Sequence, residues 1–258
     1  MMENKWLGSK TKQGFYKMTK NANGKREILS LDLNTLEYRA KKSAKFETLE
    51  LTKSIDNVTD RFKVLVAGKD KAGEFYRKSF AAMFAYVQNR IPEISDEIYR
   101  IDDGLRAGFG WEHGPFEIWN EIGVATGVEL MKSEGKKVPS WILEMLESGR
   151  ESFYIIEKGE RNYWCPIQKQ PVVIKSNPKI LNLAIHKTGV KTLKRDLSAS
   201  INDLGDGILN VEFHSILQPT LNPIDGSYIE MINTALDLIE KGDYKGMVLG
   251  HQGANFCA

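Results

Sequence analysis

The histidines are the side chains of this sequence best suited to acid–base chemistry near neutral pH, and they are few. Their spacing matches no metal-ligand pattern; they are His113, His186, His214 and His251. His113 follows Glu112 in a glycine-rich segment, so the two side chains could form an acid–base dyad. Because no third group lies within reach in the sequence to orient such a dyad, we interpret His113 as a polar loop residue.

Neither the cysteines nor the glycines form a recognisable cofactor site. Cys165 and Cys257 are far apart, which argues against a disulfide framework or a zinc site and favours a reducing compartment. The segment Gly108-Phe109-Gly110 lies between predicted helices, and no Gly-x-Gly-x-x-Gly pattern follows a strand. We therefore interpret this segment as a turn and predict neither a dinucleotide site nor a metal site in these residues.

Composition and charge are those of an ordinary globular protein. The 258 residues include 36 basic and 34 acidic side chains, and the formal net charge of +2 argues against nucleic-acid binding driven by charge. The opening MMENKWLGSKTK contains no apolar stretch of signal-peptide length, and no run of about 18 apolar residues occurs. We predict a cytoplasmic protein with no nucleic-acid partner and no integral membrane contact.

An all-α region is expected after a polar beginning. Residues 1–59 are predicted to be an irregular lead-in, and apolar residues in 60–148 recur at helical spacing. The first stripe is Phe80, Met83, Phe84, Val87 and Ile91, and the second is Ile94, Ile98, Ile101 and Leu105. We place Pro92 in the first turn of the second helix. Further helices are predicted from Pro115, at 125–133 and at 139–147. This spacing predicts four to six helices.

The remaining sequence predicts β structure. Residues 149–203 form a connector in which Lys158-Gly159-Glu160 is typical of a hairpin turn, and the polar stretch ending in Ser198-Ala199-Ser200 is interpreted as a linker. Residues 204–258 predict a strand, a helix and a second strand. The stripe of that helix is Ile229, Ile232, Leu236 and Ile239. A strand–helix–strand unit requires parallel pairing, and one helix covers a single face of such a sheet. The fold class is α+β, and the last unit is expected to be the beginning of a domain.

Four segments of the helical region form a recognisable combination: Asn89-Arg90-Ile91, Ile101-Asp102 with Leu105, Gly108-Phe109-Gly110 and Gly114-Pro115-Phe116-Glu117. This combination resembles the C-terminal helical domain of 3-hydroxyacyl-CoA dehydrogenases. Glu112-His113 departs from the usual pair before Gly-Pro-Phe, a departure that resembles the second of two tandem repeats in multifunctional members. The opening WLGSKTKQGFY (6–16) is similar to the end of the first repeat. The resemblance implies that the first repeat and the NAD-binding domain are partners of this chain.

Asn89 is the residue of this region with a counterpart in the family's active site. In a catalytic repeat it would orient the substrate and the catalytic histidine, whereas in a second repeat it would be vestigial and act as a helix-end cap. We favour the vestigial interpretation.

In residues 204–258, the predicted strand–helix–strand unit is accompanied by the segments Leu221-Asn222 and Phe256-Cys257-Ala258. These residues resemble the start of a crotonase-type (enoyl-CoA hydratase/isomerase) domain, a family that continues with Gly-Ala-Asn/Asp. The resemblance implies that this loop contributes to the oxyanion hole that polarises the thioester carbonyl, that Cys257 packs, and that the two catalytic carboxylates lie beyond Ala258. It also implies an acyl-CoA contact at Thr220, Leu221, Asn222 and Ala258. A turn held by the side chain of Asn222 itself is an equal alternative.

Together these resemblances predict part of a bifunctional fatty-acid β-oxidation enzyme. The intact enzyme would hydrate 2-enoyl-CoA and oxidise 3-hydroxyacyl-CoA with NAD, and these 258 residues alone would catalyse neither reaction. The alternative is a non-catalytic helical module that binds a partner protein. An acyl-CoA-binding protein is a third hypothesis, which we do not favour because half of the expected pocket lies outside the chain.

Overall fold

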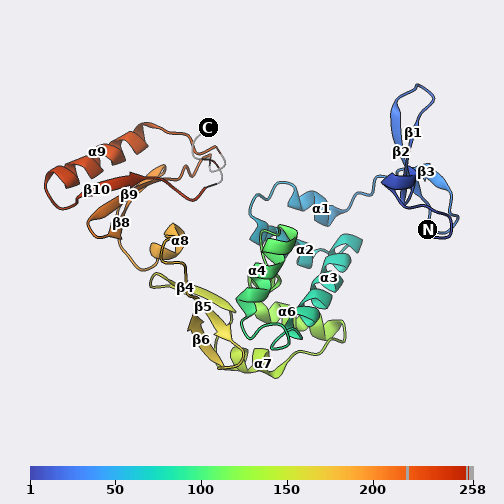
Figure 1. The fold of residues 1–258 in the computed structure, drawn as a ribbon, viewed down its shortest axis with the longest axis horizontal. Helices are drawn as coiled ribbons and strands as arrows, with labels where there is room; N and C mark the ends of the chain where they lie inside the picture. The colour runs from blue at the N-terminus through green and yellow to red at the C-terminus, as the bar shows by residue number, and fades with distance from the viewer. Residues whose placement is uncertain (219–220, 254, 256–258) are drawn as a thin grey trace. The chain divides into compact units, whose positions relative to one another are not determined.

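The structure is a computed structural model that describes residues 1–218, 221–253 and 255. The chain divides into two units, Met1–Ser54 and Ile55–Ala258, and both contain helices and small sheets, as expected for the α+β class (Figure 1). Among the described residues no helix combines the length and the hydropathy that crossing a bilayer would require.

The first unit contains a small antiparallel sheet, so the prediction of an irregular lead-in is wrong. Its elements are η1 (Ser9–Thr11), β1 (Tyr16–Lys20), β2 (Arg26–Leu31), β3 (Tyr38–Ala40) and α1 (Glu47–Thr52). The strands pair in the order β1-β2-β3. Asn21 closes the first turn, since its side-chain oxygen accepts the N–H groups of Asn23 and Lys25, both at 3.0 Å. This local side-chain hydrogen bonding turns two short runs into a hairpin.

The second unit begins with a bundle of helices. They are α2 (Val58–Ala67), α3 (Lys71–Gln88), α4 (Ile98–Phe109), α5 (Pro115–Ile122), α6 (Val124–Ser133) and α7 (Ser140–Glu147). Aromatic rings fill the centre: Phe84 stacks on Trp119 with 4.6 Å between ring centroids, and the edge of Phe153 meets Trp119. All three side chains are fully buried. The six helices and the helix start at Pro115 agree with the sequence prediction.

The chain between α3 and α4 differs from the prediction. Helix α3 ends at Gln88 and α4 begins at Ile98, so Pro92 is not in the first turn of a helix and Ile94 is exposed. The Ser95 hydroxyl accepts the N–H of Glu97 and donates to its carbonyl, both at 3.1 Å. These bonds hold the residues before α4 in a turn and delay the helix start.

A three-stranded antiparallel sheet follows the bundle. It consists of β4 (Tyr154–Glu157), β5 (Glu160–Cys165) and β6 (Gln170–Val173). The hairpin prediction is confirmed, with Lys158 and Gly159 in the left-handed conformation that two-residue hairpin turns require. The third strand was not predicted.

The C-terminal part combines antiparallel and parallel pairing. After α8 (Leu183–His186) come β7 (Thr192–Arg195), β8 (Ala199–Gly205), β9 (Ile208–Phe213), α9 (Gly226–Glu240) and β10 (Gly246–Leu249). The strand order is β10-β9-β8-β7, and β9 pairs with β10 in parallel, which confirms the strand–helix–strand prediction. The predicted linker at 198–200 is wrong, because Ala199 and Ser200 belong to β8 and are buried against β9.

Helix α9 packs on the sheet with a stripe other than the predicted one. The side chains that meet the apolar sheet face are Tyr228, Met231 and Ala235, all buried. Two residues of the predicted stripe, Ile229 and Leu236, are 49% and 41% exposed. The helix therefore carries apolar side chains on two faces, which the periodicity of one stripe does not reveal.

Candidate functional site

Asn222 lies at the carboxyl end of β9. Its side-chain oxygen accepts the Ser215 N–H at 2.8 Å, and its amide group donates to the Phe213 carbonyl at 3.2 Å. The side chain is buried and ties the loop to the strand end instead of closing its own turn. Asn222 has φ of 50°, a conformation that Asn adopts more readily than most residues.

The other predicted acyl-CoA contacts are less well placed. Leu221 is 49% exposed and does not line the cavity beside Asn222. Thr220 and Ala258, together with Phe256 and Cys257, lie outside the described residues.

A cavity of about 450 Å³ opens where β9 ends. Residues from α8, β7, β9, the Asn222 loop and the segment after β10 line it: Ala184, Lys187, Arg195, Glu212, Phe213, His214, Ser215, Ile216, Asn222, His251, Gln252 and Gly253. Its position agrees with a general rule, because ligands of parallel sheets bind at the carboxyl ends of the strands. Lys187 and Arg195 against a single carboxylate, that of Glu212, make the cavity suitable for an anionic group.

His251 forms one wall of this cavity. Its ring meets the Phe213 ring with 4.3 Å between centroids, and its Nε2 atom lies 3.3 Å from the Asn222 side-chain nitrogen. The Gly253 N–H donates to His251 Nδ1 at 2.7 Å. Both ring nitrogens of His251 therefore face N–H groups of the chain itself, one from the Gly253 backbone and one from the Asn222 side chain.

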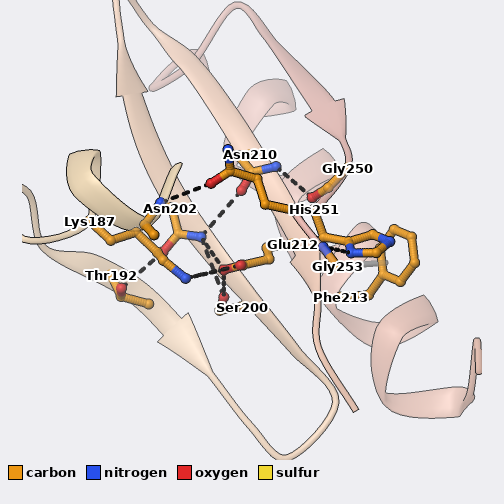
Figure 2. Close-up of polar contacts among 12 residues, drawn as sticks. Lys187, Thr192, Ser200, Asn202, Asn210, Glu212, Phe213, Gly250, His251 and Gly253 are labelled. Carbon is orange, nitrogen blue, oxygen red and sulfur yellow. Dashed lines mark hydrogen bonds and ion pairs between the residues drawn. The ribbon is translucent and has the colours of Figure 1, made fainter. Parts of the chain in front are cut away.

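Beneath the cavity, the face of the sheet away from α9 is polar and buried. Glu212 of β9 accepts the Lys187 ammonium with both oxygens, at 2.9 and 2.8 Å, and one oxygen also accepts the Ser200 hydroxyl at 3.2 Å (Figure 2). Asn202 donates to the same oxygen at 3.3 Å. With its lone pairs occupied by these donors, Glu212 is a structural anion rather than a free base.

The polar face continues to the edge of the sheet. Asn202 accepts the Thr192 hydroxyl at 2.9 Å and donates to the Asn210 side-chain oxygen at 3.3 Å (Figure 2). Asn210 donates to the carbonyls of Val248 and Gly250, at 3.3 and 3.1 Å, and so fixes the segment that leads from β10 to His251. The network therefore orients the cavity wall through the backbone of β10.

A second buried carboxylate lies in the helical bundle. Asp102 of α4 is fully buried and accepts the N–H groups of Phe116 and Glu117, at 2.8 and 3.2 Å, and the Tyr154 hydroxyl at 2.6 Å. Burial raises the pKa of Asp102 to about 7, although the Tyr154 hydroxyl and the Phe116 N–H oppose this rise. Asp102 thus fastens the start of α5 and the strand β4 to α4.

The Gly-Pro-Phe-Glu segment completes this arrangement. A Cβ on Gly114 would overlap the Asp102 side chain, so only glycine allows this close approach. The Glu117 carboxylate accepts the Gly114 N–H at 2.8 Å and pairs with Arg106 and Arg161. Burial raises the pKa of Glu117, but these donors outweigh burial and hold it below its usual range.

Two further residues that the sequence singled out, Asn89 and His113, lie in the bundle. Asn89 is exposed and caps the end of α3 through its backbone N–H, as a helix-end residue would, and its substrate role stays a prediction. His113 meets the Phe62 ring edge-on, and its buried Nδ1 has no hydrogen-bond partner in the described part of the chain. His113 also lines a polar cavity of about 460 Å³ with Glu117, Asn120 and Arg161.

The Gly108-Phe109-Gly110 segment is a helix end. Gly108 and Phe109 belong to the last turn of α4, and Gly110 caps it with φ of 66°, so this segment is a helix end and no phosphate cradle follows a strand. Across the same residues no group of three or more His, Cys, Asp or Glu side chains could hold a metal ion.

Comparison with known proteins identifies relatives. The probable 3-hydroxyacyl-CoA dehydrogenase of Bacillus subtilis is 37% identical over 257 residues, which cover 100% of this chain and 31% of that protein. The putative fatty acid oxidation complex trifunctional enzymes of Rickettsia felis and Rickettsia prowazekii are 25% and 24% identical over 130 and 131 residues. These matches cover 47% and 51% of this chain and 16% of each protein. This chain is homologous to a part of these proteins.

The matched segments are short compared with the relatives themselves. The chain spans less than a third of the length of the curated relatives it matches. No protein family profile matches the chain, and no solved structure matches it.

The sequence pointed to some of these residues and not to others. Asp102 and Glu117 belong to the segments that resemble the dehydrogenases, but the resemblance did not predict their hydrogen bonds or ion pairs. Lys187 and Glu212 are 25 positions apart and carried no signal, because the pair is created by the docking of α8 on the sheet.

Proposed function

We propose that this chain is the part of a bifunctional β-oxidation enzyme that joins the helical domain of a 3-hydroxyacyl-CoA dehydrogenase to the start of a crotonase-type hydratase. The observation that carries the proposal is the alignment of the whole chain with one relative, the probable 3-hydroxyacyl-CoA dehydrogenase of Bacillus subtilis. The alignment includes both the helical bundle and the parallel strand–helix–strand unit. The whole enzyme would hydrate 2-enoyl-CoA and oxidise 3-hydroxyacyl-CoA with NAD, which binds outside these residues.

The cavity at the end of β9 is the proposed acyl-CoA contact of this chain. Arg195 lines the cavity and forms no ion pair in the described part of the chain, so its guanidinium is available to a phosphate. Lys187 adds a second positive charge, partly neutralised by Glu212. Asn222 and His251 form the cavity wall along which the pantetheine arm of coenzyme A would lie. An anionic, acceptor-rich ligand such as coenzyme A matches these donors.

Catalysis by the 258 residues alone is not expected. Glu212 is fully engaged with donors, and the helical bundle offers no nucleotide site, so neither proton transfer nor hydride transfer has its groups in place. Purified chain should therefore show no hydration of crotonyl-CoA and no NAD-dependent oxidation of 3-hydroxybutyryl-CoA.

A chimera tests the function of the whole enzyme. This chain would replace the aligned third of the Bacillus subtilis relative, and the chimera would be assayed for both reactions. We expect the two activities to persist within about tenfold of the relative, a loss of about 1.4 kcal/mol. A folded chimera that oxidises but does not hydrate would refute the crotonase part of the proposal. Loss of both activities in a folded chimera would refute the whole.

Titration calorimetry of the full chain with coenzyme A tests the cavity separately. Arg195→Ala should weaken binding about fivefold to tenfold, the loss typical of one charge-assisted hydrogen bond at a partly open site. Lys191→Ala removes a nearby exposed cation that does not line the cavity and should leave affinity unchanged. Equal affinities for the two variants would contradict the proposed contact.

Exposed apolar residues favour a second candidate function, a non-catalytic module that binds a partner protein. Ile229 and Leu236 of α9, which are 49% and 41% exposed, are two examples. This candidate predicts that the chimera loses both activities while the chain still binds another protein surface.

A further inference from the structure

The two units of the chain carry opposite net charge. Residues 1–54 contain 12 Lys and Arg against 6 Asp and Glu, whereas residues 55–258 contain 24 against 28. The first unit is therefore at +6 and the second at −4, although the whole chain is close to neutral. Opposite charges of this size favour encounter between the first unit of one copy and the second unit of another copy.

The β1–β2 hairpin exposes one apolar face with cations at its end, which we name the hairpin face. Met18 pairs directly with Ile28, and Lys20 pairs with Arg26, so these side chains lie on the same side of the hairpin as Tyr16. Tyr16, Met18 and Ile28 are 63%, 54% and 49% exposed. Ser30 pairs with Tyr16 on this face and Glu27 projects from the opposite side, so the hairpin face carries apolar, basic and hydroxyl side chains and no carboxylate.

The hairpin face is concave where it meets the segment before β1. A groove of about 610 Å³ lies there, lined by Gly8, Ser9, Lys12, Gly14, Phe15, Tyr16, Met18 and Ile28. In residues 1–54, all of which are described, Lys12, Lys20 and Arg26 form no ion pair. A concave apolar groove with unpaired cations fits a projecting acidic helix better than it fits a flat lipid surface.

Helix α9 carries exposed apolar and acidic side chains on its outward side, and we name this surface the helix face. Ile229 and Leu236, 49% and 41% exposed, are seven residues apart on its outward side, and Ile232 borders them. Asp237 and Glu240 are exposed beside this stripe and form no ion pair within the described residues. The stripe from Ile229 to Leu236 is about 10 Å long, close to the roughly 13 Å from Tyr16 to Lys20 along β1.

We propose that the hairpin face of one copy of this chain docks on the helix face of a second copy. Apolar side chains would cover each other, while Lys20 and Arg26 would lie opposite Asp237 and Glu240. Every copy carries both faces, so a reciprocal exchange of the two contacts between two copies would leave neither face uncovered. The reciprocal exchange doubles the buried area, which brings two small contacts toward the roughly 1,200 Å² that a specific interface needs.

Sedimentation velocity of the full chain tests this dimer. We expect a shift from monomer to dimer between about 1 and about 100 µM, and a weaker dimer in about 0.5 M than in about 0.1 M salt. The double variant Lys20→Glu/Arg26→Glu and the double variant Asp237→Lys/Glu240→Lys should each raise the dissociation constant about tenfold or more. The chain that carries all four substitutions restores opposite charges and should return to within about threefold of the parent.

The control carries the same change of charge away from the hairpin face. Lys41→Glu/Lys42→Glu lowers the net charge of the first unit by the same amount but lies outside the hairpin, so it should raise the dissociation constant by no more than about threefold. Circular dichroism would show that all variants are folded. A monomer at every concentration would overturn the proposal, and so would failure of the quadruple variant to restore the dimer or an equal effect of the control.

Discussion

Asp102 of the helical bundle and Glu212 of the C-terminal sheet are both buried carboxylates, yet the protein compensates their charge differently. Asp102 accepts hydrogen bonds from a tyrosine hydroxyl and two backbone N–H groups. Glu212 accepts the Lys187 ammonium with both oxygens, and Ser200 and Asn202 as well. The first carboxylate is held by neutral donors and the second by a full positive charge.

Because their partners differ, the stability of the bundle should depend on pH, and the stability of the sheet should depend on the Lys187 ammonium. A buried carboxylate without a direct cation gains from binding a proton, and the pKa of Asp102 rises to about 7 accordingly. A carboxylate that shares an ion pair depends instead on keeping its cation, because removal of one partner leaves a buried charge. The bundle is therefore expected to sense pH through Asp102, and the sheet to depend on the docking of Lys187.

Removal of the Asp102 carboxylate is expected to cause the largest loss of stability among the changes to the two buried carboxylates. Asp102→Ala leaves the Tyr154 hydroxyl and the N–H groups of Phe116 and Glu117 buried without an acceptor. We expect it to lower the free energy of unfolding by about 3 kcal/mol at pH 7. Urea denaturation followed by tryptophan fluorescence measures the loss, since Trp119 is in the same core. Asp103→Ala, next to it on the exposed side of α4, should cost about 0.5 kcal/mol or less. Similar losses in both variants would show that the hydrogen bonds of Asp102 to α5 and β4 do not stabilise the fold.

The dependence of the unfolding free energy on pH tests whether Asp102 binds a proton in the folded chain. The pKa of Asp102 is about 7 in the folded chain and 3.8 in the reference state, so the folded state binds more protons between these values. The resulting stabilisation is complete below about pH 4 and is lost as pH rises through about 7. From pH 5 to pH 8 it should fall by about 2.5 kcal/mol. Asp102→Asn cannot titrate, so its stability should change less over this range. An unchanged pH slope in this variant would contradict the assignment.

Loss of the lysine tests the other carboxylate. Lys187→Met leaves Glu212 buried without its cation, and we expect about 2 kcal/mol of destabilisation, less than for a fully buried pair because Lys187 is 30% exposed. The second change Glu212→Gln removes the unpaired charge, so Lys187→Met/Glu212→Gln should recover at least half of the loss. Lys191→Met serves as the exposed control. A double variant as unstable as the single one would show that the ion pair is not essential to the sheet.

Local patterns of the sequence predicted much of the fold. Helical spacing located the bundle, Pro115 marked a helix start, and alternation with a following stripe predicted the parallel pairing of β9 and β10. These features depend on neighbours within about one to two turns of helix or one strand, and periodicity records such neighbours. The hairpin of the first unit was missed although Arg26 to Leu31 alternates, because polar neighbours concealed a half-exposed sheet.

The contacts that build the candidate site are long-range and had no local signal. Tyr154 is 52 positions from Asp102, and Lys187 is 25 positions from Glu212, so only the packed structure brings the partners together. The prediction of which side of α9 meets the sheet was wrong for a related reason. Ile229 and Leu236 fit helical spacing as well as Met231 does, and spacing alone does not say which of two apolar faces meets the sheet. Glu212 of β9 is buried by Lys187 and Ser200, partners that periodicity does not show.

Removal of one neutral donor from each carboxylate gives the smallest and most selective test. Tyr154→Phe deletes the 2.6 Å bond to Asp102 and should cost about 1.5 kcal/mol, whereas Ser200→Ala deletes the 3.2 Å bond to Glu212 and should cost about 0.5 kcal/mol. The Tyr154 hydroxyl lowers the pKa of Asp102, so its loss should move the pH transition of stability upward. Ser200→Ala should leave that transition in place, because Lys187 still neutralises Glu212. Denaturation curves from pH 5 to about 9 separate the two outcomes. A transition that moves equally in both variants would mean that donor type does not distinguish the two carboxylates.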